Sequence, residues 1–256
     1  MNFPIEISQN DIGVSMSSNF MGAKITRSYD KMVKDEREWY RGLPDVTVEL
    51  SFNDGLVGLN EAASIQGFIS LFDLALLSVM SRGREVAIEI GSLYGRSTRV
   101  INGNVPVMFA VDTFNGEDDG SYGTTYDGLI AQYCIREIFD EHARTFPNEL
   151  HTIQDRSDNA IKQFLDKGYR GKVDFIFIDG DHSYEGAKSD VVNYLPLLAD
   201  GGVMCGHDYQ YEPLRCAVDE VLGDKVIPLC ALKDDDFSRW LKLMNLKHEM
   251  WAYIKK

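Results

Sequence analysis

Short runs of β-branched and aromatic residues alternate with longer helical segments from residue 60 to the end of the sequence. Asn60 can cap the first helical segment, where apolar residues recur every three or four positions from Ile65 to Val79. Alternating strand and helix patterns predict parallel βαβ units, and therefore a doubly wound α/β sheet with helices on both faces. The predicted strands cover residues 85–90, 107–111, 151–154, 173–178, 202–205, 226–229 and 250–254. The predicted helices cover residues 60–82, 128–146, 159–167, 187–198 and 212–222, and a further helix starts at Ser97.

Residues 1–58 lack this alternation and mix Asn, Ser, Gly and charged residues. They contain one helical candidate, residues 28–41, and one strand candidate, residues 46–52. We interpret residues 1–58 as an N-terminal extension or lid, and residues 59–256 as one ligand-binding domain.

The charge of the chain limits its partners. It has 26 Lys and Arg against 40 Asp and Glu, which gives a net charge of −14. Such a surface repels a phosphate backbone, so we expect no nucleic-acid partner. No apolar run approaches the ~20 residues that span a bilayer, and the first ten residues lack a secretory signal, so we expect no membrane and a cytoplasmic location.

Two predicted strands end in residues suited to a nucleoside ligand. After residues 85–90 comes Glu89-Ile90-Gly91-Ser92-Leu93-Tyr94-Gly95-Arg96-Ser97, a turn that lets the backbone approach a ligand closely. This turn matches neither the GxGxxG dinucleotide fingerprint nor the GxSxG hydrolase motif. Asp112 ends the next strand, 21 residues beyond Gly91, where a carboxylate can accept hydrogen bonds from a ribose diol.

Two later strands deliver acids and imidazoles to the same edge of the predicted sheet. Asp179, Asp181 and His182 follow the strand at residues 173–178. His207 and Asp208 follow the strand at residues 202–205. Ligands bind at the carboxyl ends of the strands in such sheets, so we expect these side chains to form one reactive site.

These four segments together resemble the class I methyltransferases that use S-adenosylmethionine, and more narrowly the O-methyltransferases of sugars and natural products. The resemblance runs from about Gln66 to Tyr253, although Leu93 stands where many relatives carry a glycine. It implies a Rossmann-like sheet of seven strands whose last strand is antiparallel. It places the methionine part of the cofactor by Glu89, Gly91, Ser92, Gly95 and Ser97, its ribose by Asp112, and its adenine by Ser157 and Asp158. We also predict that Thr113 and Asp179 bind the cofactor.

A hydroxyl is a weak nucleophile at pH 7, so its methylation needs a general base or a metal ion. Asp179, His207 and Asp208 are the predicted ligands of a divalent ion such as Mg²⁺, although imidazole is an unusual ligand for Mg²⁺. Asp181 and His182 are alternative catalytic bases, and the pKa of an ordinary imidazole near ~6.5 favours His182. Whether a metal is required stays open.

Three other functions compete with O-methylation. They are an NAD(P)-dependent oxidoreductase, a catalytically silent cofactor-binding protein, and a methyltransferase acting on nitrogen. The missing GxGxxG pattern argues against the first, and the acid and imidazole cluster argues against the second. The sequence predicts a small-molecule acceptor bearing a hydroxyl, but identifies neither that acceptor nor the oligomeric state.

Overall fold

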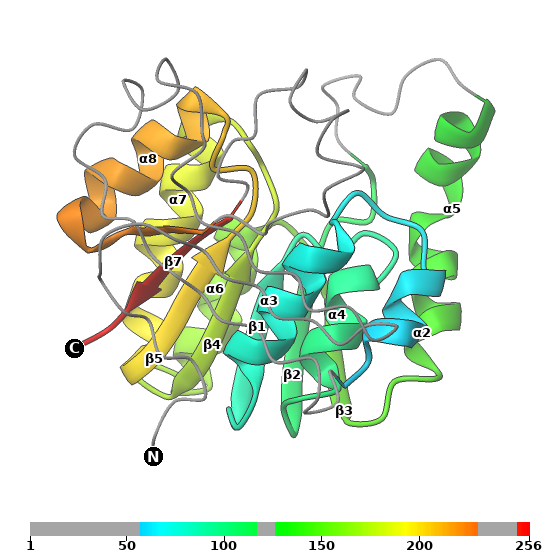
Figure 1. Cartoon of the computed structure of the whole chain (residues 1–256), viewed down its shortest axis with the longest axis horizontal. Helices are drawn as coiled ribbons and strands as arrows, with labels where there is room; N and C mark the ends of the chain where they lie inside the picture. Colours follow the sequence, from blue (N-terminus) through cyan, green and yellow to red (C-terminus); the bar gives the residue numbers. More distant parts are fainter. Residues whose placement is uncertain (1–56, 117–125, 230–249) are drawn as a thin grey trace, which may run out of the picture.

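The computed structural model describes residues 57–116, 126–229 and 250–256. Nearly all of the predicted extension or lid, including its helix and strand candidates, lies outside these residues. The described part is an α/β sandwich in which a central sheet runs between two layers of helices (Figure 1).

One sheet of seven strands forms the centre, in the order β3-β2-β1-β4-β5-β7-β6. The strands are β1 (Val86–Ile90), β2 (Val107–Asp112), β3 (Glu149–Gln154), β4 (Val173–Ile178), β5 (Leu198–Gly206), β6 (Ile227–Leu229) and β7 (Met250–Ile254). Pairings among β1 to β5 are parallel, whereas β7 is antiparallel to both β5 and β6. This confirms the predicted Rossmann-like sheet and its antiparallel last strand.

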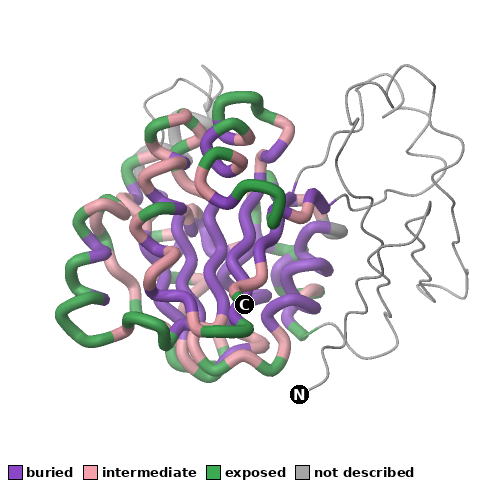
Figure 2. The backbone as a smooth tube through the Cα atoms, turned by 90° about the vertical axis from the view of Figure 1, so that its left-hand side faces the viewer, coloured by how far each residue is buried: buried purple, intermediate pink, exposed green. Residues whose placement is uncertain are grey.

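Helices bury both faces of the sheet, as the buried strands in Figure 2 show. The α-helices are α2 (Leu59–Ser64), α3 (Leu71–Ser81), α4 (Arg96–Asn102), α5 (Tyr126–Ala143), α6 (Ser157–Asp166), α7 (Tyr184–Tyr194) and α8 (Glu212–Leu222). Helices α2, α3 and α4 pack with alternate strand residues such as Ala87 and Phe175 on one face. Helices α6, α7 and α8 pack with the intervening residues, such as Ile88 and Ile176, on the other face. Buried parallel strands must be apolar on both sides, which explains their continuous hydrophobic runs.

The predicted continuous helix over residues 60–82 is wrong, because α2 and α3 are separate helices. Ile65 is extended at the end of α2, and its carbonyl accepts a hydrogen bond from Arg96 Nη1 at 2.5 Å. Arg96 Nε also donates to the carbonyl of Ile69 at 3.0 Å. Ser70 then caps α3 by accepting from the Asp73 amide at 3.2 Å. Gly58, rather than Asn60, stands at the start of α2.

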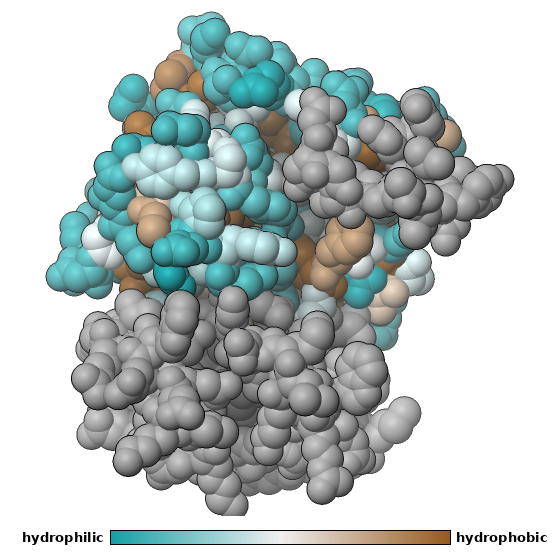
Figure 3. Space-filling view, turned by 90° about the horizontal axis from the view of Figure 1, so that it is seen from above, coloured by the Kyte–Doolittle hydropathy of each residue, from teal (hydrophilic) through white to brown (hydrophobic). Residues whose placement is uncertain are grey.

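The surface agrees with the acidic composition. Figure 3 shows that the described atoms on the face it views are mainly hydrophilic, with scattered hydrophobic patches. Among the described residues, no helix is long and apolar enough to cross a membrane.

Candidate active site

Backbone hydrogen bonds join the carboxyl ends of the four central parallel strands. The Gly91 amide donates to the Val111 carbonyl at 2.9 Å, and the Asp179 amide donates to the Ile90 carbonyl at 2.8 Å. The His207 amide donates to the Ile178 carbonyl at 3.1 Å. The turns after β1, β2, β4 and β5 therefore lie side by side, as the sequence predicts.

The turn after β1 is shaped by Asp112. Asp112 Oδ2 accepts from the amides of Ser92 at 2.7 Å and Leu93 at 2.8 Å, and its Oδ1 accepts from the Phe114 amide at 2.6 Å. Leu93 adopts a left-handed backbone with φ 44°, a conformation that few residues other than glycine adopt readily. The carboxylate at the tip of β2 thus fixes the ligand-binding turn of β1 and lies beside it.

Gly91 is required by the packing of the two neighbouring turns. Its φ is 84°, and a Cβ atom there would lie 1.9 Å from the carbonyl oxygen of Asp179. Any other residue would push apart the turns after β1 and β4, so the glycine allows these two turns to pack closely.

Glu89 is a fully buried acid at the end of β1. Its Oε2 accepts from the hydroxyls of Ser92 at 2.9 Å and Thr98 at 2.5 Å. Among the described residues, its Oε1 is buried with no hydrogen-bond partner. Burial raises the pKa of Glu89 to about 7, although hydrogen bonds from Ser97, Thr98 and Ser92 oppose this rise. The Oε1 atom of Glu89 is therefore suited to accept a hydrogen bond from a positively charged ligand group.

We expect Glu89→Gln to flatten the pH dependence of stability. The pKa of Glu89 in the folded state, about 7, exceeds its ordinary value of 4.5, so the folded state binds this proton more tightly. The stabilisation is complete below pH 4.5 and is lost as pH rises through 7, a change of roughly 3 kcal/mol. Urea unfolding of both proteins between pH 4 and 8 measures it. Parallel curves for the two proteins would contradict the raised pKa.

Asp179, His182 and Asp208 form a compact group whose ligand atoms all lie within 4.8 Å of one another. His182 Nε2 lies 3.1 Å from Asp208 Oδ2 and 3.8 Å from Asp179 Oδ1. Asp208 Oδ1 accepts from the Gln210 side chain at 2.8 Å, and Asp208 has a left-handed φ of 59°. Two carboxylates and one imidazole could hold a divalent cation or move a proton.

His207 borders this group. Its Nδ1 lies 3.1 Å from Asp208 Oδ2 and 3.9 Å from Asp179 Oδ1. Its Nε2 faces Asp73 Oδ2 of α3 at 3.6 Å. The structure thus brings His182 into the compact group with Asp179 and Asp208, and the metal-binding role of His207 stays a prediction.

The acids keep both imidazoles charged. Burial opposes the charged form of His182, but the nearby carboxylates of Asp179 and Asp208 outweigh it and raise its pKa to about 11. Burial likewise opposes protonation of His207, but Asp208 and Asp73 raise its pKa well above the usual value. The same two imidazoles hold the pKa of Asp208 far below normal despite its burial. His182 can accept a proton only when another cation neutralises its acids.

Asp181, the alternative base, lies outside the compact group of Asp179, His182 and Asp208. Its side chain is exposed, and its Oδ1 accepts from the Ser183 amide at 2.8 Å in a local turn. It lies near enough to Arg156 and Asp190 to affect their pKa values. Whether Asp181 or His182 acts as the base stays a prediction.

The other predicted cofactor residues occupy the surrounding turns. Gly95 is left-handed with φ 90°, and Ser97 is buried in the first turn of α4. Thr113 Oγ1 accepts from the Asn115 amide at 3.3 Å, beside Asp112. Asp158 pairs with Arg156 at 3.2 Å on the surface after β3. The hydroxyl of Ser157 turns inward and donates to Asp190 Oδ1 at 2.5 Å.

Sequence reasoning missed three residues near the site. Asp73 is fully buried on α3, and the capping pattern Ser70-x-x-Asp73 conceals its contact with His207. The Tyr211 ring lies nearly parallel to that of His182, with centroids 6.1 Å apart and an interplanar angle of 16°. Asp190 is 2% exposed, and an acid within the apolar face of α7 was the signal that could have found it.

Comparison with known proteins agrees with this geometry. Residues 88–209 match a protein family described as a methyltransferase domain. A curated relative, the uncharacterized protein y4gI of Sinorhizobium fredii, is 31% identical over 130 residues. That match covers 47% of this chain but only 13% of the relative.

Solved structures share the fold at low identity. A protein of Klebsiella pneumoniae, provisionally assigned as an O-methyltransferase, has a TM-score of 0.50 and 13% identity over 79% of this chain and 89% of that chain. The O-methyltransferase from Bacillus cereus, in complex with SAH, has a TM-score of 0.49 and 16% identity over 80% and 95% of the two chains. Residues 88–209 therefore match a methyltransferase domain, and the described residues share the fold of the Klebsiella pneumoniae protein.

Proposed function

We propose that this protein is an S-adenosylmethionine-dependent O-methyltransferase that methylates a hydroxyl group of a small molecule. The observation that carries the proposal is the buried acid Glu89 at the glycine turn of a methyltransferase domain, with its Oε1 unpartnered among the described residues. A buried acceptor without a donor is costly, so a cationic ligand group such as the cofactor ammonium would satisfy it.

The residues around this acid fit the rest of the cofactor. Asp112 stands at the tip of β2 beside the turn after β1, where its carboxylate would accept the ribose hydroxyls. The turn after β3, with Ser157 at the start of α6, would border the adenine. S-adenosylmethionine would supply an electrophilic methyl group carried on a sulfonium.

Asp179, His182 and Asp208 would activate the acceptor. Their two carboxylates suit a hard divalent cation such as Mg²⁺ or Mn²⁺, so these two acids fit a metal. Neutralising the two acids in this way would lower the pKa of His182 and make its imidazole a competent base. We therefore assign cation binding to the acids and proton acceptance to His182.

The proposed transfer is an in-line displacement. The acceptor oxygen would bond to the methyl carbon as the carbon–sulfur bond breaks, and the cofactor would leave as a neutral thioether that keeps the bonding pair on sulfur. The proton of the hydroxyl passes to His182, so the net charge is conserved. The protein aligns the two reactants and holds that proton.

The proposal is tested by methyl transfer from radiolabelled S-adenosylmethionine to matched panels of small-molecule alcohols, amines and thiols. We expect transfer to an alcohol, its loss with EDTA, and its recovery with Mg²⁺ or Mn²⁺. His182→Ala should lower kcat about 10²–10⁴-fold. His151→Ala, which removes an exposed imidazole on the edge strand β3, should leave kcat unchanged. Transfer only to amines, or full activity of His182→Ala, would contradict the proposal.

A further inference from the structure

Asp190 is a buried acid that the proposed reaction does not use. The inward face of α7 consists of Ala187, Asp190, Val191 and Tyr194, and all four are buried. The other three pack in the apolar layer between α7 and the sheet, so an apolar side chain at position 190 would fit the same pattern. A carboxylic acid at such a position costs free energy, and this points to a specific role.

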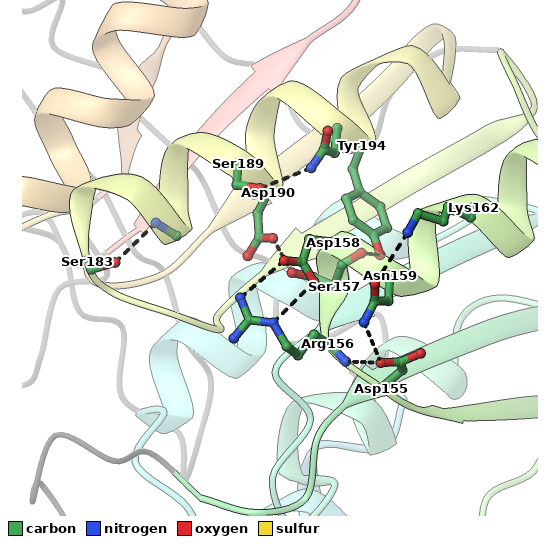
Figure 4. Close-up of polar contacts among 12 residues, drawn as sticks. Asp155, Arg156, Ser157, Asp158, Asn159, Lys162, Ser183, Ser189, Asp190 and Tyr194 are labelled. Atoms are coloured by element: carbon green, nitrogen blue, oxygen red, sulfur yellow. Dashed lines mark hydrogen bonds and ion pairs between the residues drawn. The ribbon is translucent and has the colours of Figure 1, made fainter.

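Two side chains of α7 hold the same residue of the neighbouring turn. The hydroxyl of Ser157 donates to Asp190 Oδ1 at 2.5 Å, and the hydroxyl of Tyr194 donates to the Ser157 carbonyl at 2.9 Å. Figure 4 shows Asp190 and Tyr194 both directed at Ser157, while Arg156 and Asp158 pair separately. Ser157 is therefore held from the protein interior at both its side chain and its carbonyl. The exposed part of the turn lies one residue away.

The surroundings of Asp190 are mainly acidic. Burial raises its pKa to about 7, the Ser157 hydrogen bond lowers it, and the charges of Asp181 and Asp158 raise it further. Arg156 is the cation that opposes this effect. Near neutral pH a large share of Asp190 is thus uncharged, which reduces the penalty of burying it beside two other acids.

Asp190 also lies beneath the turn that follows β4. A Cβ atom on Gly180 would stand 3.5 Å from Asp190 Oδ2. Gly180 lies between Asp179 and His182 in sequence. One carboxyl group therefore contacts the turn after β3 through Ser157 and lies under the reactive turn after β4.

We propose that Asp190 is a positioning residue that sets the turn after β3 for recognition of the cofactor's adenine. This inference rests on the proposed function, because it assigns the adenine to that turn. Asp190 contacts no ligand. It holds the Ser157 hydroxyl inward, and so determines where the first turn of α6 stands against the base.

The test compares two ligands on the full chain by calorimetry: S-adenosylhomocysteine and S-inosylhomocysteine, which differ at the six-position of the purine. Wild-type protein should prefer the adenine ligand about tenfold or more, as one well-placed hydrogen bond allows. Asp190→Ala should reduce this preference to less than threefold, mainly by weakening the adenine ligand. Asp190→Asn keeps an oxygen that accepts from Ser157, so it should restore the preference.

Further variants separate positioning from general destabilisation. Ser157→Ala should reduce the preference as Asp190→Ala does, and the double variant should reduce it no further. A purely structural role would weaken both ligands equally and leave their ratio unchanged, and that result would overturn the proposal. So would a wild-type protein that binds the two ligands equally. If Asp190→Ala does not fold, the other two variants decide. The proposal is supported if Ser157→Ala changes the ratio of the two ligand affinities while Asp190→Asn keeps the wild-type ratio. Any other pair of results overturns it.

Failure of the proposed function gives a different result. If wild-type protein binds neither ligand, the cofactor assignment is wrong and the inference about Asp190 is overturned with it. If wild-type protein discriminates and Asp190→Ala discriminates equally well, only the role of Asp190 is overturned.

Discussion

Replacing Asp112 by alanine should raise the Kd for S-adenosylhomocysteine at least about 100-fold. Asp112 accepts hydrogen bonds from the amides of Ser92 and Leu93 in the glycine turn, so its loss frees that turn. In our account the same carboxylate also accepts the ribose hydroxyls. Two hydrogen bonds to a charged group contribute about 3 kcal/mol together, which corresponds to the expected factor. Calorimetric titration of the variant measures it.

Asp174→Ala is the matched control. Asp174 also accepts from two backbone amides, those of Glu85 at 3.2 Å and Val86 at 3.1 Å, but it does so at the opposite end of β1. Asp174→Ala should lower the free energy of unfolding about as much as Asp112→Ala does. It should leave the Kd for S-adenosylhomocysteine unchanged. Equal affinities for wild type and Asp112→Ala would show that the ribose assignment is wrong.

Asp208→Asn should weaken Mn²⁺ binding at least about 100-fold and abolish metal-stimulated methyl transfer. Asparagine has the same shape and tolerates the left-handed backbone at this position, so the change removes the charge with little strain. Loss of a residue that only supports the metal ligands costs about 10- to 100-fold in metal affinity. Loss of a ligand itself should cost at least as much. Titration monitored by the electron paramagnetic resonance of free Mn²⁺ gives the affinity directly.

Asp219→Asn is the control for removing one carboxylate charge. Asp219 Oδ1 accepts from the Tyr209 hydroxyl at 2.5 Å, and the residue lies on α8 outside the group of Asp179, His182 and Asp208. We expect unchanged Mn²⁺ affinity for this variant. If Asp208→Asn bound Mn²⁺ as tightly as wild type, the metal would not bind at this group.

The strands were predictable from sequence where burial alone sets the residue pattern. The predicted strands at residues 173–178 and 250–254 coincide with β4 and β7, since strands buried on both faces are continuous apolar runs. The break between α2 and α3 was not predictable, because the apolar repeat continues through Ile65 and Ile69. Their carbonyls bind Arg96, a partner about 30 residues away that no local pattern reveals.

The sequence predicts which turns form the candidate site, but not which side chains contact one another within it. Strand ends indicated that Asp112, Asp179 and Asp208 lie at one edge, because parallel strands end together. The partners of each side chain depend on helices that pack from elsewhere in the chain. Asp73 of α3 faces Nε2 of His207 at 3.6 Å, and this contact joins residues 134 positions apart (207 − 73).

Calorimetric titration of the wild-type protein with S-adenosylhomocysteine, with and without Mg²⁺ and beside NAD⁺, tests the central claim most directly. Among the described residues, Glu89 Oε1 is buried without a partner, and this oxygen and the Asp112 carboxylate are the groups that would bind the ligand. Our account predicts micromolar binding of S-adenosylhomocysteine in both conditions and no binding of NAD⁺. Absence of S-adenosylhomocysteine binding in both conditions, or preferential binding of NAD⁺, would contradict it.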